Sequence, residues 1–220
     1  MDWIAKNIYW TSLALDGIFV SKTNGRYVHH LLSDVSSNPR GIALDPRYGV
    51  LFFADYSIDS FIARVGMDGG DSMKKIIKDH LYWPVGLTID YTTHRLYWID
   101  AHLNRIESSN YDGHSRYIVL EEVPHGATLA VFEDSMYWSE RDLKQVEKAN
   151  KRTGADRELL FTLAHQPFGI HVVHPLQQQP HDHRCAIDNG GCDQLCLIAD
   201  GGIGVTCACS AYFELQPDKQ

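Results

Sequence analysis

The feature that most constrains the fold of this chain is a pattern that occurs four times. Each copy starts with two adjacent aromatic residues and ends, two positions later, at a polar or acidic residue. The copies are Tyr9-Trp10-Thr11-Ser12, Phe52-Phe53-Ala54-Asp55, Tyr97-Trp98-Ile99-Asp100 and Tyr137-Trp138-Ser139-Glu140. Between their first aromatic residues the steps are 43, 45 and 40 residues. A period of this length is typical of architectures in which each repeat is one supersecondary unit.

Two further marks keep nearly the same period. One is a proline two residues before a glycine, and the other is a turn that ends in glycine. The first occurs at Pro39/Gly41, Pro84/Gly86, Pro124/Gly126 and Pro167/Gly169, and the second at Asn24-Gly25, Asp68-Gly69, Asp112-Gly113 and Thr153-Gly154. Where the proline and the aromatic pair both occur, the proline comes 13 residues earlier. Three marks that agree make a chance pattern a poor explanation.

Each repeat is predicted to contain four short strands. The expected strands are 41–45, 51–55, 62–65 and 74–77 in one repeat, and 86–90, 96–100, 105–108 and 116–119 in the next. The first is apolar, the second aromatic, the third leads into an Asp-Gly hairpin turn, and the fourth carries charges suited to an edge. Because no long helical period is present, the pattern indicates blades of a β-propeller.

The aromatic tetrad, the Pro-x-Gly mark and the Asp-Gly turn together resemble the YWTD repeat of the low-density lipoprotein receptor family. The stretch 125–134 is similar to the start of that family's last full repeat, and the receptor-related proteins are the nearest match. The resemblance implies an all-β fold: a partial YWTD propeller (about four of six blades) over 1–179 and an EGF-like disulfide module over 180–220. The chain therefore resembles a fragment, and we expect it to aggregate or fold loosely alone, because an open ring exposes apolar blade faces.

The resemblance also implies roles for the tetrad residues. Its aromatics pack between blades, and its acid hydrogen-bonds backbone of the neighbouring blade. Asp55 and Asp100 fit that pattern, whereas Ser12 is too short and Glu140 too long. The aromatic positions are Tyr9, Trp10, Phe52, Phe53, Tyr97, Trp98, Tyr137 and Trp138. We interpret all of them as architectural residues rather than ligand contacts.

All five cysteines lie within 185–209, which is typical of a disulfide framework and an oxidising compartment. Spacing alone leaves the pairing open. The cysteines and the turn 189–191 resemble an EGF-like module, and that resemblance implies the pairs Cys185–Cys196 and Cys192–Cys207, with Cys209 unpaired. The tail 212–219 resembles the segment before the sixth cysteine. A zinc site is disfavoured, because Cys207-x-Cys209 is a poor zinc spacing.

The sequence predicts no cofactor of its own. Asp182 is the only acid just before the first cysteine, so calcium is expected only in neighbouring modules of such receptors. The histidines at 171, 174, 181 and 183 lie near the linker, where a physiological metal site is not expected. No Gly-x-Ser-x-Gly, His-Glu-x-x-His or phosphate-binding loop occurs, so we predict that the chain is not an enzyme.

Twelve histidines are many for this length, and histidine titrates near endosomal pH. His125 matches a histidine of the related family segment, and His102 and His80 fall in loops or at strand ends. These three are the candidates for a pH switch. The alternative is that surface histidines are distributed by chance.

The formal net charge of −8 disfavours nucleic acid as a partner and mildly favours basic ones. No signal peptide or membrane-spanning run is visible. The leading hypothesis is an extracellular segment of a single-pass endocytic receptor that cycles through endosomes, binds lipoproteins or other secreted proteins, contacts neighbouring receptor modules, and releases ligand in acid. The alternative is a propeller–EGF protein-binding module of an extracellular matrix protein or a Wnt co-receptor.

Overall fold

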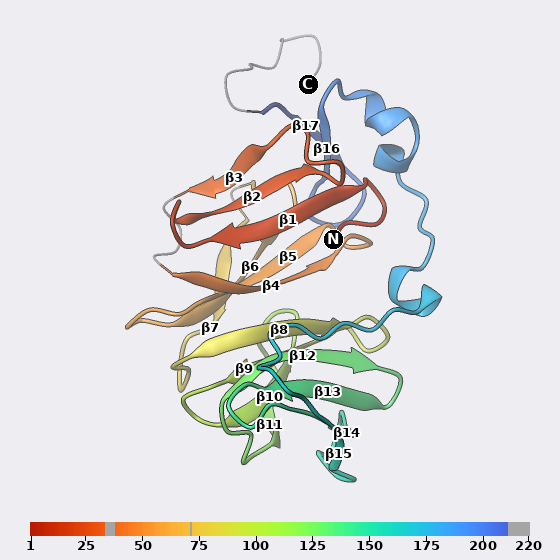
Figure 1. The fold of residues 1–220 in the computed structure, drawn as a ribbon. Helices are drawn as coiled ribbons and strands as arrows, with labels where there is room; N and C mark the ends of the chain where they lie inside the picture. The colour runs from red at the N-terminus through yellow and green to blue at the C-terminus, as the bar shows by residue number, and fades with distance from the viewer. Residues whose placement is uncertain (34–37, 71, 211–220) are drawn as a thin grey trace.

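A computed structural model describes residues 1–33, 38–70 and 72–210, and they form the predicted all-β fold. The strands make five antiparallel sheets, of which four are blades stacked in an arc and the fifth is a small C-terminal hairpin (Figure 1). Within each blade the strands follow one another in chain order. The YWTD-propeller fold class predicted from the repeat is confirmed.

The blades repeat the same sheet. Blade 1 has β1 (Asn7–Ser12), β2 (Gly17–Lys22) and β3 (His29–Ser33); blade 2 has β4 (Pro39–Asp45), β5 (Val50–Asp55), β6 (Phe61–Gly66) and β7 (Lys74–Ile77). Blade 3 has β8 (Pro84–Asp90), β9 (Arg95–Asp100), β10 (Arg105–Asn110) and β11 (Tyr117–Leu120); blade 4 has β12 (Gly126–Phe132), β13 (Ser135–Glu140), β14 (Gln145–Asn150) and β15 (Glu158–Thr162). In blade 1, Asp2 forms a β-bridge with Asn7. This pairing is equivalent to that of Asp45 with the start of β5 in blade 2 and of Asp90 with the start of β9 in blade 3.

The core lies between adjacent blades, and the tetrad aromatics form much of it. Tyr9 and Phe53 belong to the cluster between blades 1 and 2, Phe52 and Trp98 to the next, and Tyr97 and Trp138 to the third. Trp10 and Tyr137 are half-buried on the outer faces of blades 1 and 4. Neighbouring residues of each pair thus face opposite sides of the blade, as in any strand.

The Pro-x-Gly mark has a steric basis. A Cβ at Gly41 would meet Val85 O at 2.8 Å, and one at Gly86 would meet Ala127 O at 2.9 Å. The first strands of adjacent blades therefore approach more closely than a side chain permits. The fourth mark, at Pro167/Gly169, differs: among the described residues no strand occurs between 163 and 183, because no aromatic second strand follows to pair with it.

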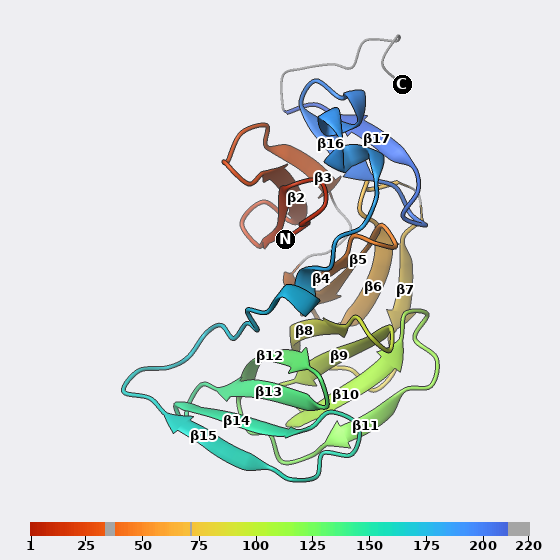
Figure 2. The same ribbon diagram turned by 90° about the vertical axis from the view of Figure 1, so that its right-hand side faces the viewer.

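The segment 163–183 runs back along the first strands to the C-terminal module (Figure 2). It contains the short 3-10 helix η1 (Pro175–Gln178) and is tied down by Gln177 Nε2, which donates to Val131 O at 2.8 Å. Trp3 Nε1 donates to Gln179 O at 2.9 Å. This segment and β4, β8 and β12 line a cleft of about 1020 Å³.

The C-terminal module comprises η2 (Arg184–Ala186), η3 (Asp188–Gly191), β16 (Leu195–Ile198) and β17 (Val205–Ala208). Its disulfides join Cys185 to Cys196 and Cys192 to Cys207, the pairs that the EGF resemblance implies. Cys209 is not disulfide-bonded. The tail 212–219, which resembles the segment before the sixth cysteine of an EGF-like module, lies outside the described residues.

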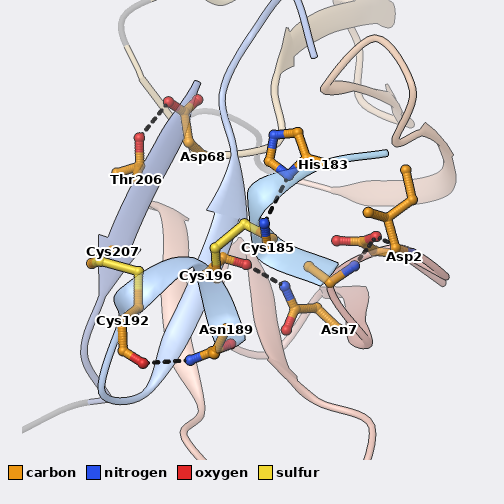
Figure 3. Close-up of a disulfide and its surroundings, with 12 residues drawn as sticks. Asp2, Asn7, Asp68, His183, Cys185, Asn189, Cys192, Cys196, Thr206 and Cys207 are labelled. Atoms are coloured by element: carbon orange, nitrogen blue, oxygen red, sulfur yellow. Dashed lines mark hydrogen bonds between the residues drawn. A yellow bond between two sulfur atoms is a disulfide. The ribbon is translucent and has the colours of Figure 1, made fainter. Parts of the chain in front are cut away.

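The module packs against blades 1 and 2. Asn7 Nδ2 donates to Cys196 O at 2.8 Å (Figure 3), and Gly201 N donates to Tyr48 O at 2.9 Å. Arg64 and Asp200 form an ion pair at 2.9 Å. Apolar residues of the module join the core of blades 1 and 2, and the first disulfide packs on the stretch 3–5.

Candidate ligand-binding face

The second strands all end at one edge of the molecule. The register pairs Pro39 with Asp55, Pro84 with Asp100, and Gly126 with Glu140. The connection that enters each blade and the turn that follows each tetrad therefore share an edge, which we call the tetrad edge. The C-terminal module contacts the opposite edge, near the turn 46–49, and among the described residues it does not cover the tetrad edge.

The acid of the tetrad organises that edge. Asp100 accepts hydrogen bonds from the backbone N–H groups of Tyr82 (2.8 Å), Trp83 (3.2 Å), His102 (3.0 Å) and Leu103 (3.0 Å). One carboxylate thus fixes both the connection into blade 3 and the turn after its second strand. Such charge-assisted bonds compensate the burial of the carboxylate.

The role that the resemblance implied for the tetrad acid needs correction at Asp100, whose bonds stay at the edge of its own blade. Asp55 accepts from Asn38 N at 3.2 Å, just before its own first strand, as Asp100 does from the connection into its own blade. The bonds of Asp100 do not reach into a neighbouring sheet, because the antiparallel register places this acid beside the start of its own first strand. Ser12 and Glu140 lack this bonding among the described residues; Glu140 accepts instead from Trp138 and Arg157.

Carboxylates that do join neighbouring blades end the first strands, and the sequence reasoning missed them. Asp45 accepts from Tyr111 Oη at 2.8 Å, and Asp90 pairs with Lys151 Nζ at 2.7 Å. Burial and Asp45 raise the pKa of Tyr111, while bonds from Lys151 and nearby threonines lower the pKa of Asp90 against the effect of burial. The available signal was the spacing, since each acid precedes its aromatic pair by seven residues.

The tetrad edge carries an exposed aromatic group spanning blades 2 and 3. The ring of Trp83 lies 5.6 Å from that of Tyr56 and 4.8 Å from that of His102, which in turn lies 5.1 Å from Tyr82. The guanidinium of Arg40 lies 5.4 Å from the centre of the Tyr56 ring. We call these five residues the Trp83 cluster. Trp83 and Tyr82 are 44% and 49% exposed, a composition typical of binding hot spots.

Aliphatic side chains extend the apolar character of the edge. Three residues after the last tetrad position, Leu15, Ile58 and Leu143 are 63%, 103% and 50% exposed in blades 1, 2 and 4. The turn between the second and third strands positions each of them. These side chains add exposed apolar surface to the edge in three of the four blades.

The candidate pH-switch histidines all lie on the tetrad edge, but in different surroundings. His102 contacts the aromatic rings of the Trp83 cluster. His125 Nδ1 lies 3.4 Å from Asp142 Oδ2, with both side chains about half exposed. His80 has an exposed side chain, and its carbonyl accepts from Arg116 Nη2 at 2.9 Å.

Blades 3 and 4 each contain an arginine cluster, in which an arginine pairs with a buried glutamate and lies over a tryptophan ring. This cluster was not predicted from the sequence. Arg116 pairs with buried Glu107 at 2.6 Å, and its guanidinium lies 5.4 Å from the Trp98 ring. Arg157 likewise pairs with Glu147, and its guanidinium lies 5.4 Å from the Trp138 ring. Each glutamate follows its tryptophan by nine residues, which was the signal in the sequence.

No cluster of three His, Cys, Asp or Glu residues suited to a metal ion occurs among the described residues. In that part of the chain, no helix has the length and apolar character required to cross a membrane.

Comparison with known proteins agrees with the repeat. Residues 6–46 match the family model "low-density lipoprotein receptor repeat class B". The whole chain is 34% identical to the vitellogenin receptor of Solenopsis invicta over 220 residues, and 34% identical to the vitellogenin receptor Yl of Drosophila melanogaster over 222 residues. It spans 12% and 11% of the lengths of these two receptors.

Solved structures share the fold. A nidogen/laminin complex contains a chain that is 28% identical, with a TM-score of 0.67, over 71% of this chain and 60% of that one. A streptogramin B lyase matches at 15% identity and a TM-score of 0.59, over 74% and 54% of the two chains, which shows similarity of fold alone.

Proposed function

Because the chain belongs to the low-density lipoprotein receptor family, we propose that it is an extracellular, ligand-binding segment of an endocytic receptor whose tetrad edge contacts a protein ligand. The Trp83 cluster is the observation that carries this proposal. A group of large aromatic side chains exposed together is typical of a binding site, and Trp, Tyr and Arg are the residues enriched in binding hot spots.

The nature of the ligand follows from the relatives and from the charge. The similar receptors are named for vitellogenin, so we infer a vitellogenin-like secreted protein as the ligand. The net charge of −8 would favour encounter with basic surfaces of such a ligand. Binding rather than catalysis is the proposed activity, on the extracellular side of a membrane receptor.

The proposal is tested by Trp83→Ala in the full chain, with immobilised vitellogenin as the probe. Affinity is expected to fall at least about tenfold, roughly 1.4 kcal/mol, because a central aromatic anchor is lost. Phe161→Ala is the matched control: it removes an aromatic side chain that is 60% exposed on β15, away from the Trp83 cluster. Equal affinity of the Trp83 variant and the unmodified chain would reject the tetrad edge as the binding face.

Release in acid forms the finer part of the proposal. His102 lies between Trp83 and Tyr82, so its protonation would add a second cation to the Trp83 cluster, which already contains Arg40. His125 lies beside Asp142, where protonation would strengthen an ion pair. The measured quantity is the ratio of vitellogenin affinity at neutral pH to that near pH 5.5. In His102→Ala and His125→Ala this ratio should be closer to one than in the unmodified chain. An unchanged ratio in both variants would contradict acid release through these residues.

A second function is favoured by the similarity to a chain of the nidogen/laminin complex. In that case the tetrad edge would bind a matrix protein, and the chain would serve adhesion rather than uptake. Laminin in place of vitellogenin in the same assay discriminates the two. Tight laminin binding that depends on Trp83, without vitellogenin binding, would favour the matrix function.

A further inference from the structure

Glu140 ends the tetrad of blade 4, and its side chain is fully buried. Its Oε1 accepts from Trp138 Nε1 at 3.1 Å and from Arg157 Nη2 at 3.3 Å. Its Oε2 is also buried and has no hydrogen-bond partner among the described residues. Because a buried carboxylate oxygen without a donor is unfavourable, the ionised form of Glu140 is poorly accommodated.

The equivalent acid of blade 3 has no such deficit. Asp100 receives four backbone N–H bonds from the connection and the turn at its edge. Glu140 is one methylene longer, and its carboxylate lies against Trp138 and Arg157 instead. The unsatisfied oxygen is therefore a consequence of glutamate at this position.

A second buried carboxylate competes for the same guanidinium. Glu147 accepts from Arg157 Nε at 2.5 Å and from Nη2 at 3.1 Å, and that Nη2 also serves Glu140. Arg157 further donates to the carbonyl of Glu122 at 2.8 Å. The two carboxylates and the one guanidinium leave one net negative charge in this cluster, so one proton is favourable there.

The other charged groups near Glu140 lie toward the rim. On β12 and β14 its strand partners are Gly126 and Gln145, which carry no charge. At the rim, His125 and Asp142 form the exposed pair described above, and Arg141 also contacts Asp142. Glu147 and Arg157 are thus the charged groups that bear most directly on the buried carboxyl group.

We propose that Glu140 is a proton-binding switch: its carboxyl group takes up a proton in mild acid, shares it within the Glu140–Glu147–Arg157 cluster, and so stabilises blade 4 on acidification. The proton comes from solvent, and the neutral acid supplies the O–H donor that the ionised cluster lacks. This inference concerns the stability of blade 4 and does not depend on the identity of any ligand.

The sign of the effect follows from proton linkage. Burial raises the pKa of Glu140 above its ordinary value; Trp138 and Arg157 oppose the shift, and Glu147 adds to it. Between the ordinary and the raised pKa the folded chain binds more protons than the unfolded chain, so stability rises as pH falls. This stabilisation is fully present below the ordinary glutamate pKa and is lost as pH rises through the folded pKa.

The direct test is a titration of Glu140 in the full chain by NMR of 13C-labelled glutamate carboxyl groups. The Glu140 signal should titrate above the ordinary value of about 4.3. A midpoint at or below that value would overturn the proposal. This measurement needs no variant, so it decides the matter even if substitutions at this position impair folding.

Hydrogen exchange then tests the consequence for blade 4, with rates corrected for intrinsic pH dependence. In the unmodified chain, opening of the β13 amides should become about tenfold rarer between neutral pH and the ordinary glutamate pKa for each unit by which the pKa is raised. Glu140→Gln should remove that trend, while Glu133→Gln, at an exposed position, should retain it. The same pH trend in Glu140→Gln as in the unmodified chain would assign the effect to another group.

Discussion

At the scale of single residues, the blades are joined by buried polar pairs as well as by aromatic rings. The pair of Asp90 and Lys151 is the clearest, since both side chains are at most 4% exposed. Lys151→Ala would leave the Asp90 carboxylate buried without its cation, at a cost of about 3–5 kcal/mol in the free energy of unfolding. Lys148→Ala, which removes a largely exposed pair with Glu158, should cost under about 1 kcal/mol. Urea unfolding at neutral pH measures both, and equal costs would contradict the importance of burial.

The same pair gives a pH prediction of opposite sign to that for Glu140. The pKa of Asp90 is lowered in the folded chain, where bonds from Lys151, Thr92 and Thr93 outweigh the effect of burial. Its stabilisation is present above the ordinary aspartate pKa and is lost as pH falls through the lowered value. In Lys151→Ala the largest of these bonds is gone, so the loss of stability below about pH 4 should be shallower than in the unmodified chain. An identical slope in both would refute the linkage.

The sequence predicted residue roles only where the repeat itself encodes them. Tyr97 and Trp98 could be identified as core because their spacing matches the other copies. The partner of Asp100 could not, because it depends on strand register, which places the acid beside Trp83 N of its own connection. Asp45 carried a signal in its spacing, but its bond to Tyr111 spans 66 residues and two blades.

At the scale of elements, the arginine cluster of blade 3 connects three parts of that blade. Arg116 pairs with Glu107, lies over Trp98 and donates to the carbonyls of Asp79 and His80, in the connection that leads to Trp83. Arg116→Lys keeps the charge but loses the planar fork, so we expect a loss of about 1–3 kcal/mol in stability. Arg152→Lys, at an exposed pair with Asp134, is the control and should have little effect. Equal unfolding midpoints for the two variants would argue against a stabilising role of the arginine cluster in blade 3.

Strand prediction succeeded for most elements and failed where a partner element was required. The segment 167–173 has the same Pro-x-Gly and alternating apolar pattern as β8, yet it forms no strand among the described residues. A strand needs hydrogen-bonding neighbours, and local sequence does not specify whether they are present. The prediction that the chain alone aggregates or stays loosely folded, because open blade faces meet water, also stays a prediction.

At the scale of the whole molecule, the disulfide module and the N-terminal blade form one packed unit although they lie at opposite ends of the sequence. Asn7 and Cys196 are 189 residues apart and share a buried hydrogen bond of 2.8 Å. The repeat predicts the propeller and the cysteine spacing predicts the module, each separately. Their docking depends on long-range contacts that no sequence motif indicates. Within the part of the chain that the structure describes, this docking leaves the tetrad edge uncovered, consistent with the proposed ligand contact.

The docking can be tested through that single bond. Asn7→Ala leaves the buried carbonyl of Cys196 without this donor, which should cost about 1–3 kcal/mol locally. Hydrogen exchange should quicken together in β1 and β16, because both surfaces rely on the same contact, while β9 keeps its protection. Asn24→Ala, at an exposed turn, is the control. Faster exchange in β16 without any change in β1 would mean that the module and blade 1 unfold independently, and that the module does not hold a fixed position on the propeller.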